Sequence, residues 1–317
     1  MRTTVQVVRT SVLILAFFLS AFISTAQSLS TPDGKFEIGL GIGPLFFLGD
    51  LGGNRGVGTT LVKDINLPLT KVSKGLFVNF YPTEFFGFRV AVNQGVLQGA
   101  DSLVKDNGGE ELYRKARNLS FRSNLLEAYA AAEIYPTVFF EQYDGLQGKI
   151  RPYGVIGIGM FHFNPQTQYY SPNGTSRWVD LKPLHTEGEG FTEYPDKKEY
   201  KLTQMEIPMG VGVKYYVKDN MYLGFEIMHR KTFTDYIDDV STEYIDPALF
   251  DKYLAPEQAV IAKQVSFRGN TAGSLYAPNG EQRGNKKLND SFFSSILRFG
   301  WRLFDNSTAE HMGCPKW

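Results

Sequence analysis

Apolar and polar side chains alternate strictly through residues 201–233. Every second position from Thr203 to Val217 is apolar apart from Thr203 itself, and the positions between carry charged, glycine and aromatic residues. Because successive side chains of a β-strand point to opposite faces, this pattern predicts strands with one apolar and one mixed face. The rhythm resumes after residues 218–220, which predicts a tight turn between two strands.

The same two-residue rhythm predicts eight strands along the chain. Six lie outside the stretch described above, at residues 35–47, 74–81, 86–97, 119–135, 151–163 and 291–304. The segment 119–135 is rich in alanine and is therefore also compatible with a helix. We interpret it as a strand because Glu127, Tyr129 and Glu133 alternate with apolar neighbours.

The connections between these segments alternate in length. Residues 82–84 and 218–220 are tight turns and 136–149 is intermediate, whereas the other connections are long and polar, the longest being 234–290. Short turns on one side and long loops on the other are typical of an outer-membrane barrel. A secreted β-sandwich, the main alternative, would have shorter strands without this sidedness. The fold prediction is therefore all-β, an eight-stranded antiparallel transmembrane β-barrel with long extracellular loops.

The polar face of the strands carries acids and bases in equal number. In a closed barrel the apolar face contacts lipid, so these charges point into a lumen that eight strands leave just wide enough for side chains. An isolated buried charge is costly, and we therefore expect luminal ion pairs and a plugged barrel, with strand glycines leaving room for the arginines. The predicted luminal charges are Glu37, Arg89, Glu127, Glu133, Glu206, Lys214, Glu226, Arg230, Arg298 and Arg302.

The N-terminus has the features of a secretory signal. Arg2 and Arg9 precede the apolar run 12–23, and small residues follow at 24–26. The run is too short for a membrane-spanning helix, so we expect a signal peptide at 1–26. The barrel then occupies 27–304, and a short periplasmic tail occupies 305–317.

Composition excludes several classes of function. The chain has 33 Lys+Arg and 33 Asp+Glu, without the basic excess of a nucleic-acid binder, and its single cysteine excludes an internal disulfide framework. The four histidines lack metal-ligand spacing, and the acids at 235, 238 and 239 lack the spacing of an EF-hand. No nucleophile motif is present. We therefore expect no enzyme, cofactor, metal or small-molecule substrate.

The tail carries a distinctive ending. Cys314, Pro315 and Trp317 lie beyond the last predicted strand. One interpretation is an inert exposed tail. The other is a docking segment whose lone cysteine, in an oxidising compartment, pairs with a partner's cysteine.

Several strings resemble one family of barrels. They are GPLFFLGDL at 43–51, RNLSFRS at 117–123, FHFNP at 161–165, LHTEG at 184–188, TFTDYIDDVST at 232–242, and RGN at 268–270 and 283–285. Together they resemble the PorG family of Bacteroidota, the outer-membrane barrel component of the type IX secretion system. The resemblance implies a non-enzymatic protein that anchors a periplasmic ring of PorK and PorN. The alternative is an OmpW-like barrel for small solutes.

The stretch at 232–242 is predicted to be a structural brace. Thr234, Asp235, Asp238 and Asp239 have side chains that hydrogen-bond to neighbouring backbone, and Tyr236 lies among them. We expect this motif to hold the long outer loops over the barrel mouth.

Overall fold

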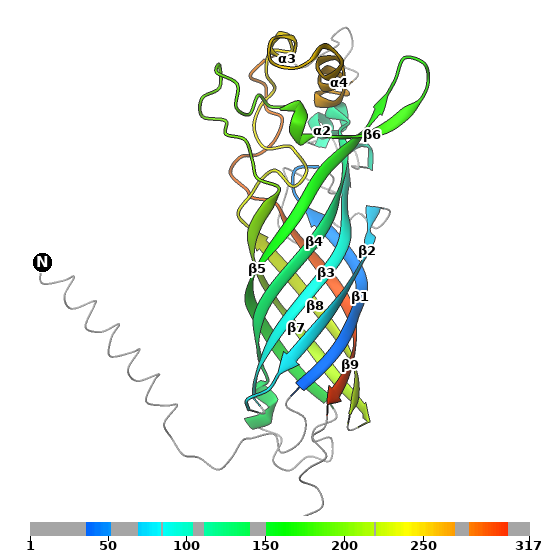
Figure 1. Cartoon of the computed structure of the whole chain (residues 1–317), viewed down its shortest axis with the longest axis vertical. Helices are drawn as coiled ribbons and strands as arrows, with labels where there is room; N and C mark the ends of the chain where they lie inside the picture. Colours follow the sequence, from blue (N-terminus) through cyan, green and yellow to red (C-terminus); the bar gives the residue numbers. More distant parts are fainter. Residues whose placement is uncertain are drawn as a thin grey trace, which may run out of the picture.

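The computed structural model describes residues 36–51, 69–83, 85–103, 111–139, 150–218, 220–269 and 279–303. Figure 1 shows a long barrel of tilted strands with a cap of loops and short helices at one end. The predicted signal peptide 1–26 and the tail 305–317, including Cys314, Pro315 and Trp317, lie outside the described residues.

Eight strands close into one antiparallel barrel. Each strand pairs with its neighbours along the chain, β4 pairs directly with β5, and β1 pairs with β9 from Phe36↔Leu303 to Leu48↔Ser291. The predicted eight-stranded antiparallel barrel is therefore confirmed. The strands are β1 (Phe36–Leu48), β2 (Lys71–Phe80), β3 (Phe86–Ala100), β4 (Ser120–Ile134), β5 (Ile150–Tyr170), β7 (Thr203–Lys218), β8 (Met221–Thr232) and β9 (Ser291–Leu303).

The alanine-rich segment forms β4, a strand, in full register with both neighbours. A helix there would leave the adjoining edges of β3 and β5 unpaired, which is costly where lipid offers no hydrogen bond. Tertiary pairing thus decides a conformation that alanine by itself leaves open.

The fifth strand is longer than the sequence pattern predicts. β5 continues past Phe163, the predicted end, through Pro165 to Tyr170. Proline cannot donate a ladder hydrogen bond, but Pro165 still lies opposite Ser123 of β4, and its carbonyl accepts a hydrogen bond from Leu181 N at 2.9 Å. The extension then pairs with a ninth, unpredicted strand, β6 (Ser176–Asp180), which forms a hairpin beside the cap (Figure 1).

The cap is built from the long connections. It contains the helices α2 (Glu111–Arg117), α3 (Ala248–Tyr253) and α4 (Pro256–Ser266), and the 3-10 turns η3 (Asp101–Leu103) and η5 (Lys182–Leu184); η4 (Pro136–Phe139) lies at the opposite end of the barrel. Its apolar core includes Ile237, Ile245 and Phe250, all fully buried. The same cluster continues into the barrel mouth through Phe161 and Phe292, so the cap and the upper lumen share one core.

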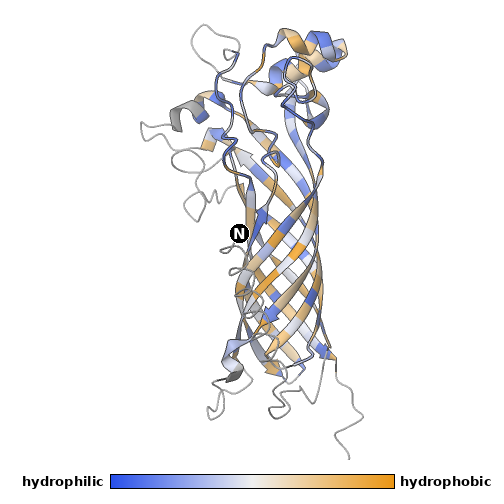
Figure 2. Cartoon of the chain, turned by 90° about the vertical axis from the view of Figure 1, so that its left-hand side faces the viewer, coloured by the Kyte–Doolittle hydropathy of each residue, from blue (hydrophilic) through white to orange (hydrophobic). Residues whose placement is uncertain are grey.

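The outer wall of the barrel is apolar. Alternate residues of every barrel strand are exposed hydrophobic side chains, such as Leu40, Ile158 and Val211, at 47%, 66% and 64% exposure. Figure 2 shows this band around the barrel, below a more hydrophilic cap. Exposed aliphatic side chains in such density require an apolar surrounding medium. No described helix is both long and apolar enough to cross a membrane.

Candidate functional site

The lower lumen is organised around Lys214 of β7. Its ammonium lies 2.8 Å from Glu37 and 3.4 Å from Glu133, with all three side chains fully buried. Tyr216 donates to the other oxygen of Glu37 at 2.7 Å, and Arg302 lies 3.6 Å from the same carboxylate. Rings of tyrosine surround the ammonium, including Tyr81, Tyr135, Tyr153 and Tyr222.

The middle of the lumen is held by Glu226. This carboxylate pairs with Arg89 at 2.6 Å and with Arg298 at 2.5 Å, and it accepts a hydrogen bond from Tyr153 at 2.6 Å. Arg89 also pairs with Glu133 and therefore links the middle layer to the lower one. Because Arg89, Glu133 and Glu226 each have two charged partners, the lower and middle layers form one network instead of a set of separate pairs.

The upper layer pairs Arg230 with Glu127 at 2.8 Å, and Asn93 donates to the same carboxylate at 2.8 Å. Glu206 departs from the expected pairing of all ten luminal charges. It is fully buried, it forms no ion pair among the described residues, and the side chain beside it is another carboxyl group, that of Glu127. The equal numbers of luminal acids and bases predicted a pairing for every charge, but Arg230 pairs with Glu127 and leaves Glu206 without an ion pair among the described residues.

The strand glycines make room mainly for aromatic rings, not for arginines as expected. A Cβ on Gly39 would collide with Phe77, one on Gly212 with Tyr153, and one on Gly300 with Tyr222. Among the described strand glycines, Gly41 and Gly224 have an arginine nearby, with Arg298 Nη1 at 4.0 Å and Arg298 Cβ at 3.4 Å. The sequence pattern did not show that tyrosines fill as much of the lumen as charges do.

Above the barrel mouth, three aspartates tie separate loops together. Asp238 accepts hydrogen bonds from Leu51 N at 2.8 Å and from Val240 N at 3.0 Å. Asp290 accepts one from Ile237 N at 2.8 Å, and Asp50 accepts one from Asn285 N at 2.6 Å. The loops after β1, after β8 and before β9 are thereby joined through carboxylates.

Two buried arginines complete this arrangement. Arg283 lies 2.8 Å from Glu187, whose carboxylate also accepts Ser241 N and Thr242 N at 2.9 Å each. Arg117 binds both oxygens of Asp101, at 2.8 and 2.9 Å, and donates to Asp50 O at 2.7 Å. We call this assembly the carboxyl knot; it comprises Asp50, Asp101, Glu187, Glu189, Asp235, Asp238, Asp239, Asp290, Arg117 and Arg283.

The predicted brace motif lies in the knot, and its members differ in role. Asp239 accepts hydrogen bonds from Thr186 at 2.5 Å and Tyr200 at 2.7 Å, and its backbone is left-handed at φ 65°. The backbone carbonyl of Thr234 accepts a hydrogen bond from Asp290 N at 3.0 Å. The ring of Tyr236 stacks on that of Tyr200, with ring centroids 4.8 Å apart. Asp235 is the exception, because neither of its carboxyl oxygens has a hydrogen-bond partner among the described residues.

The carboxyl knot holds more acids than bases, and the pKa values of four of its carboxyl groups are raised. Burial raises the pKa of Asp235 to about 9 and that of Glu189 to about 8. Burial also raises the pKa of Asp50 and of Asp239 to about 6 each, against the lowering influence of nearby donors. Asp235 and Glu189 are therefore protonated at neutral pH, which removes part of the mutual repulsion in the knot.

The structure brings together residues that are far apart in the sequence. The strings GDL, TEG, DYIDDVS and the second RGN all contribute to the knot through Asp50, Glu187, Asp238 and Arg283. Asp101, Arg117 and Asp290 were not predicted as site residues; Arg117 begins the string RNLSFRS, whereas no local pattern marks Asp101 or Asp290. Among the described residues no group of three or more His, Cys, Asp or Glu side chains is arranged to hold a metal ion.

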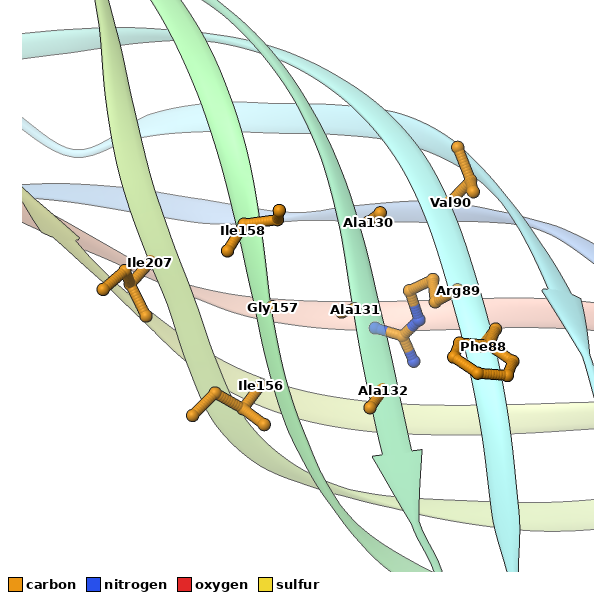
Figure 3. Close-up of a pocket in the computed structure, with 10 residues that line it drawn as sticks. All are labelled: Phe88, Arg89, Val90, Ala130, Ala131, Ala132, Ile156, Gly157, Ile158 and Ile207. Atoms are coloured by element: carbon orange, nitrogen blue, oxygen red, sulfur yellow. The ribbon is translucent and has the colours of Figure 1, made fainter. Parts of the chain in front are cut away.

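The outer wall carries a shallow apolar groove. In Figure 3 the methyl groups of Ala130 and Ala132 on β4 lie between larger side chains of β3 and β5, such as Phe88 and Ile156. The groove is thus a consequence of small residues on one strand facing lipid beside large residues on its neighbours.

Comparisons with known proteins bear mainly on the fold. A family model described as "Domain of unknown function (DUF6089)" matches residues 185–247, which include β7, β8 and the brace motif. No curated protein matches the sequence.

Several solved outer-membrane barrels are similar in structure. OprG from Pseudomonas aeruginosa has 10% identity over 88% of this chain and 100% of its own, with a TM-score of 0.40. Ail of Yersinia pestis has 9% identity over 86% and 98%, with a TM-score of 0.34. Outer membrane protein W of E. coli has 12% identity over 85% and 98%, with a TM-score of 0.31. At these values the similarity does not indicate a function.

Proposed function

We propose that this chain is a non-enzymatic outer-membrane component of the type IX secretion system that anchors a periplasmic ring of PorK and PorN. The observation that carries the proposal is the filled lumen. Glu37, Lys214, Glu226 and Arg298 are each exposed by 2% or less, and they are joined across the barrel. A barrel filled in this way is suited to anchoring, and poorly suited to transport through its own lumen.

The motifs that resemble the PorG family support the same function. Four of them, GDL, TEG, DYIDDVS and the second RGN, contribute to the carboxyl knot, where they join the loops of the cap. In this proposal the rigid knot and the luminal network keep the barrel shape constant, while the short turns and the tail 305–317 face the ring. Cys314, Pro315 and Trp317 are then the docking residues.

The test is capture of the ring from native envelopes. An affinity-tagged wild-type barrel should co-purify PorK and PorN, and non-reducing electrophoresis should show an adduct that Cys314→Ser removes. A chain ending at residue 304 should fold normally and lose the ring proteins. Failure of the full-length chain to retain either ring protein would contradict the proposal.

The alternative, an OmpW-like barrel for small solutes, is favoured by one observation. The upper lumen is lined by apolar side chains, including Leu97, Phe121, Phe161 and Phe292. The cap fills this region with Ile237 and Val240, both at most 1% exposed, so a solute would have to displace them. Single-channel conductance in planar bilayers separates the two functions, because a solute barrel should conduct or transport and the anchoring barrel should not.

A further inference from the structure

The outward face of β4, β5 and β6 changes chemistry sharply along the strands. Low on the wall this face carries Leu126, Ile158 and Met160, which are 54–66% exposed. One register step above the pair Leu126↔His162 comes Asn124↔Asn164, followed by Arg122↔Gln166↔Asp180. The polar rows therefore begin directly where the apolar belt ends, at the level of the lipid headgroups.

The polar side chains of this surface are fixed to one another. Asp180 accepts hydrogen bonds from Asn164 at 3.0 Å and from Gln166 at 2.7 Å through one oxygen. Gln166 in turn accepts one from Arg122 Nε at 3.1 Å. Exposed polar side chains normally keep their rotamer freedom, and restricting that freedom on binding costs free energy. Here that ordering is already complete, which is the condition for binding a ligand with little further loss of entropy.

An aromatic ring borders the amide rows. The guanidinium of Arg122 lies over the ring of Trp178, 3.7 Å from its centroid, and Trp178 is 39% exposed. An indole held in place by a stacked cation offers an apolar surface beside hydrogen-bonding groups. We call Arg122, Asn124, Asn164, Gln166, Trp178 and Asp180 the amide face.

The cap braces the hairpin that carries this surface. The side-chain amide of Gln264 in α4 accepts a hydrogen bond from Tyr170 N at 3.1 Å and donates one to Tyr170 O at 2.9 Å. It thus satisfies both backbone groups of Tyr170, as a neighbouring strand would. Arg177 of β6 lies 3.0 Å from Glu257 of α4. The amide face is thus built on a supported scaffold.

We propose that the amide face binds the sugar portion of a glycolipid in the outer leaflet. Planar amides can both donate hydrogen bonds to sugar hydroxyl groups and accept them, the carboxylate accepts hydrogen bonds from such groups, and the indole covers the apolar face of a sugar ring. The charges of Arg122 and Asp180 cancel, which favours uncharged sugar hydroxyls over phosphate. Continuity with the lipid belt makes the ligand a membrane-anchored saccharide instead of a free one. This inference needs the barrel in an outer membrane but does not depend on the secretion role.

The experiment measures glycolipid binding to the purified full chain in detergent by native mass spectrometry. Three probes are compared: rough lipopolysaccharide with its core oligosaccharide, lipid A without core sugars, and the released core oligosaccharide. Wild type should bind the rough lipopolysaccharide about tenfold or more tightly than either other probe, a difference of about 1.4 kcal/mol. The double variant Asn164→Ala/Gln166→Ala should bind it no better than lipid A.

Controls separate binding from folding. Gln258→Ala removes an exposed amide of α4 outside the amide face and should bind like wild type. Asp180→Asn changes an exposed side chain without removing volume, so it tests the proposal even if the double variant is unstable. It should weaken binding of rough lipopolysaccharide several-fold, and urea unfolding shows whether each variant is folded. Three results would each overturn the proposal. Lipid A could bind as tightly as rough lipopolysaccharide, the free oligosaccharide could bind as tightly as rough lipopolysaccharide, or Asp180→Asn could bind rough lipopolysaccharide as tightly as wild type. Loss of PorK or PorN capture would leave it intact.

Discussion

At the residue scale, Asp238 holds two loops with one carboxyl group. Replacing it by alanine leaves Leu51 N and Val240 N buried without an acceptor. An unsatisfied buried donor costs about 1–3 kcal/mol, so we expect Asp238→Ala to raise local opening of the cap by one to two orders of magnitude. Amide hydrogen exchange over residues 234–245 measures this opening.

The matched control is Asp196→Ala, which removes an exposed carboxyl group of the same cap. It should leave exchange unchanged. If the brace hypothesis holds, Asp238→Ala and Asp235→Ala should also keep PorK and PorN association; lost association with normally protected loops would contradict a bracing role.

The raised pKa values of the knot predict a pH dependence of the cap. Asp235, with a pKa of about 9, and Glu189, with a pKa of about 8, are protonated in the closed cap at pH 7. In an opened cap both would have ordinary values near 4 and be ionised. The closed state therefore binds more protons between about pH 4 and 9, and its stability falls as pH rises through that window.

Hydrogen exchange of the cap, corrected for intrinsic rates, should show the opening free energy falling by no more than about 1.4 kcal/mol per pH unit for each group. Asp235→Asn stays neutral throughout and should have a shallower slope than wild type. A cap that becomes more stable from pH 6 to pH 9 would be inconsistent with buried, protonated acids.

At the element scale, Glu226 connects β8 to β3 and β9. It faces both Arg89 and Arg298, so Glu226→Gln leaves two buried guanidinium groups short of negative charge. Removing one partner of a buried pair costs about 3–5 kcal/mol. We therefore expect the free energy of unfolding of the barrel in micelles to fall by about this amount, which urea titration measures as a lower midpoint.

Glu257→Gln provides the comparison, because the ion pair of Glu257 with Arg177 is exposed at the surface. An exposed pair contributes about 0–1 kcal/mol, so this variant should unfold close to wild type. Equal effects of the two substitutions would indicate that the lumen is hydrated.

At the scale of the whole molecule, the position of the apolar belt predicts where charge is tolerated. Ile158 is 66% exposed in the belt, and an arginine there should destabilise the barrel in bilayers by about 2–4 kcal/mol. Ser176→Arg, on the β6 hairpin above the belt, should cost little. Unfolding titrations in lipid vesicles compare the two, and a similar cost for both would place the membrane elsewhere.

Much of the barrel could be predicted because its signal is local. Apolar residues at every second position in β1, β7, β8 and β9 indicate which face of each strand contacts lipid. Because lipid offers no hydrogen-bonding partners, a sheet in lipid must close into a barrel. The ends of strands were less predictable, as Pro165 shows: its place inside β5 depends on Leu181, a residue of another segment. The helices α3 and α4 form inside a long polar connection whose apolar residues acquire a partner only over the barrel mouth.

The candidate sites divide in the same way. Alternation identified the luminal residues Arg89, Glu226 and Arg298, but partner choice within the lumen depends on strand register and tilt, which left Glu206 unpaired. The knot was predicted only at the brace motif. Its other half, from Asp50, Glu187 and Asp290, is assembled from three loops, and no sequence spacing specifies that meeting.

The sequence by itself determined the medium on each side of the wall, because each strand residue chooses between lipid and lumen by its own chemistry. Only the tertiary structure decided which charges share a proton or a partner and which loops are tied together. Those outcomes depend on distances between residues that are remote in the chain, and electrostatic and hydrogen-bond energies change over a few ångströms.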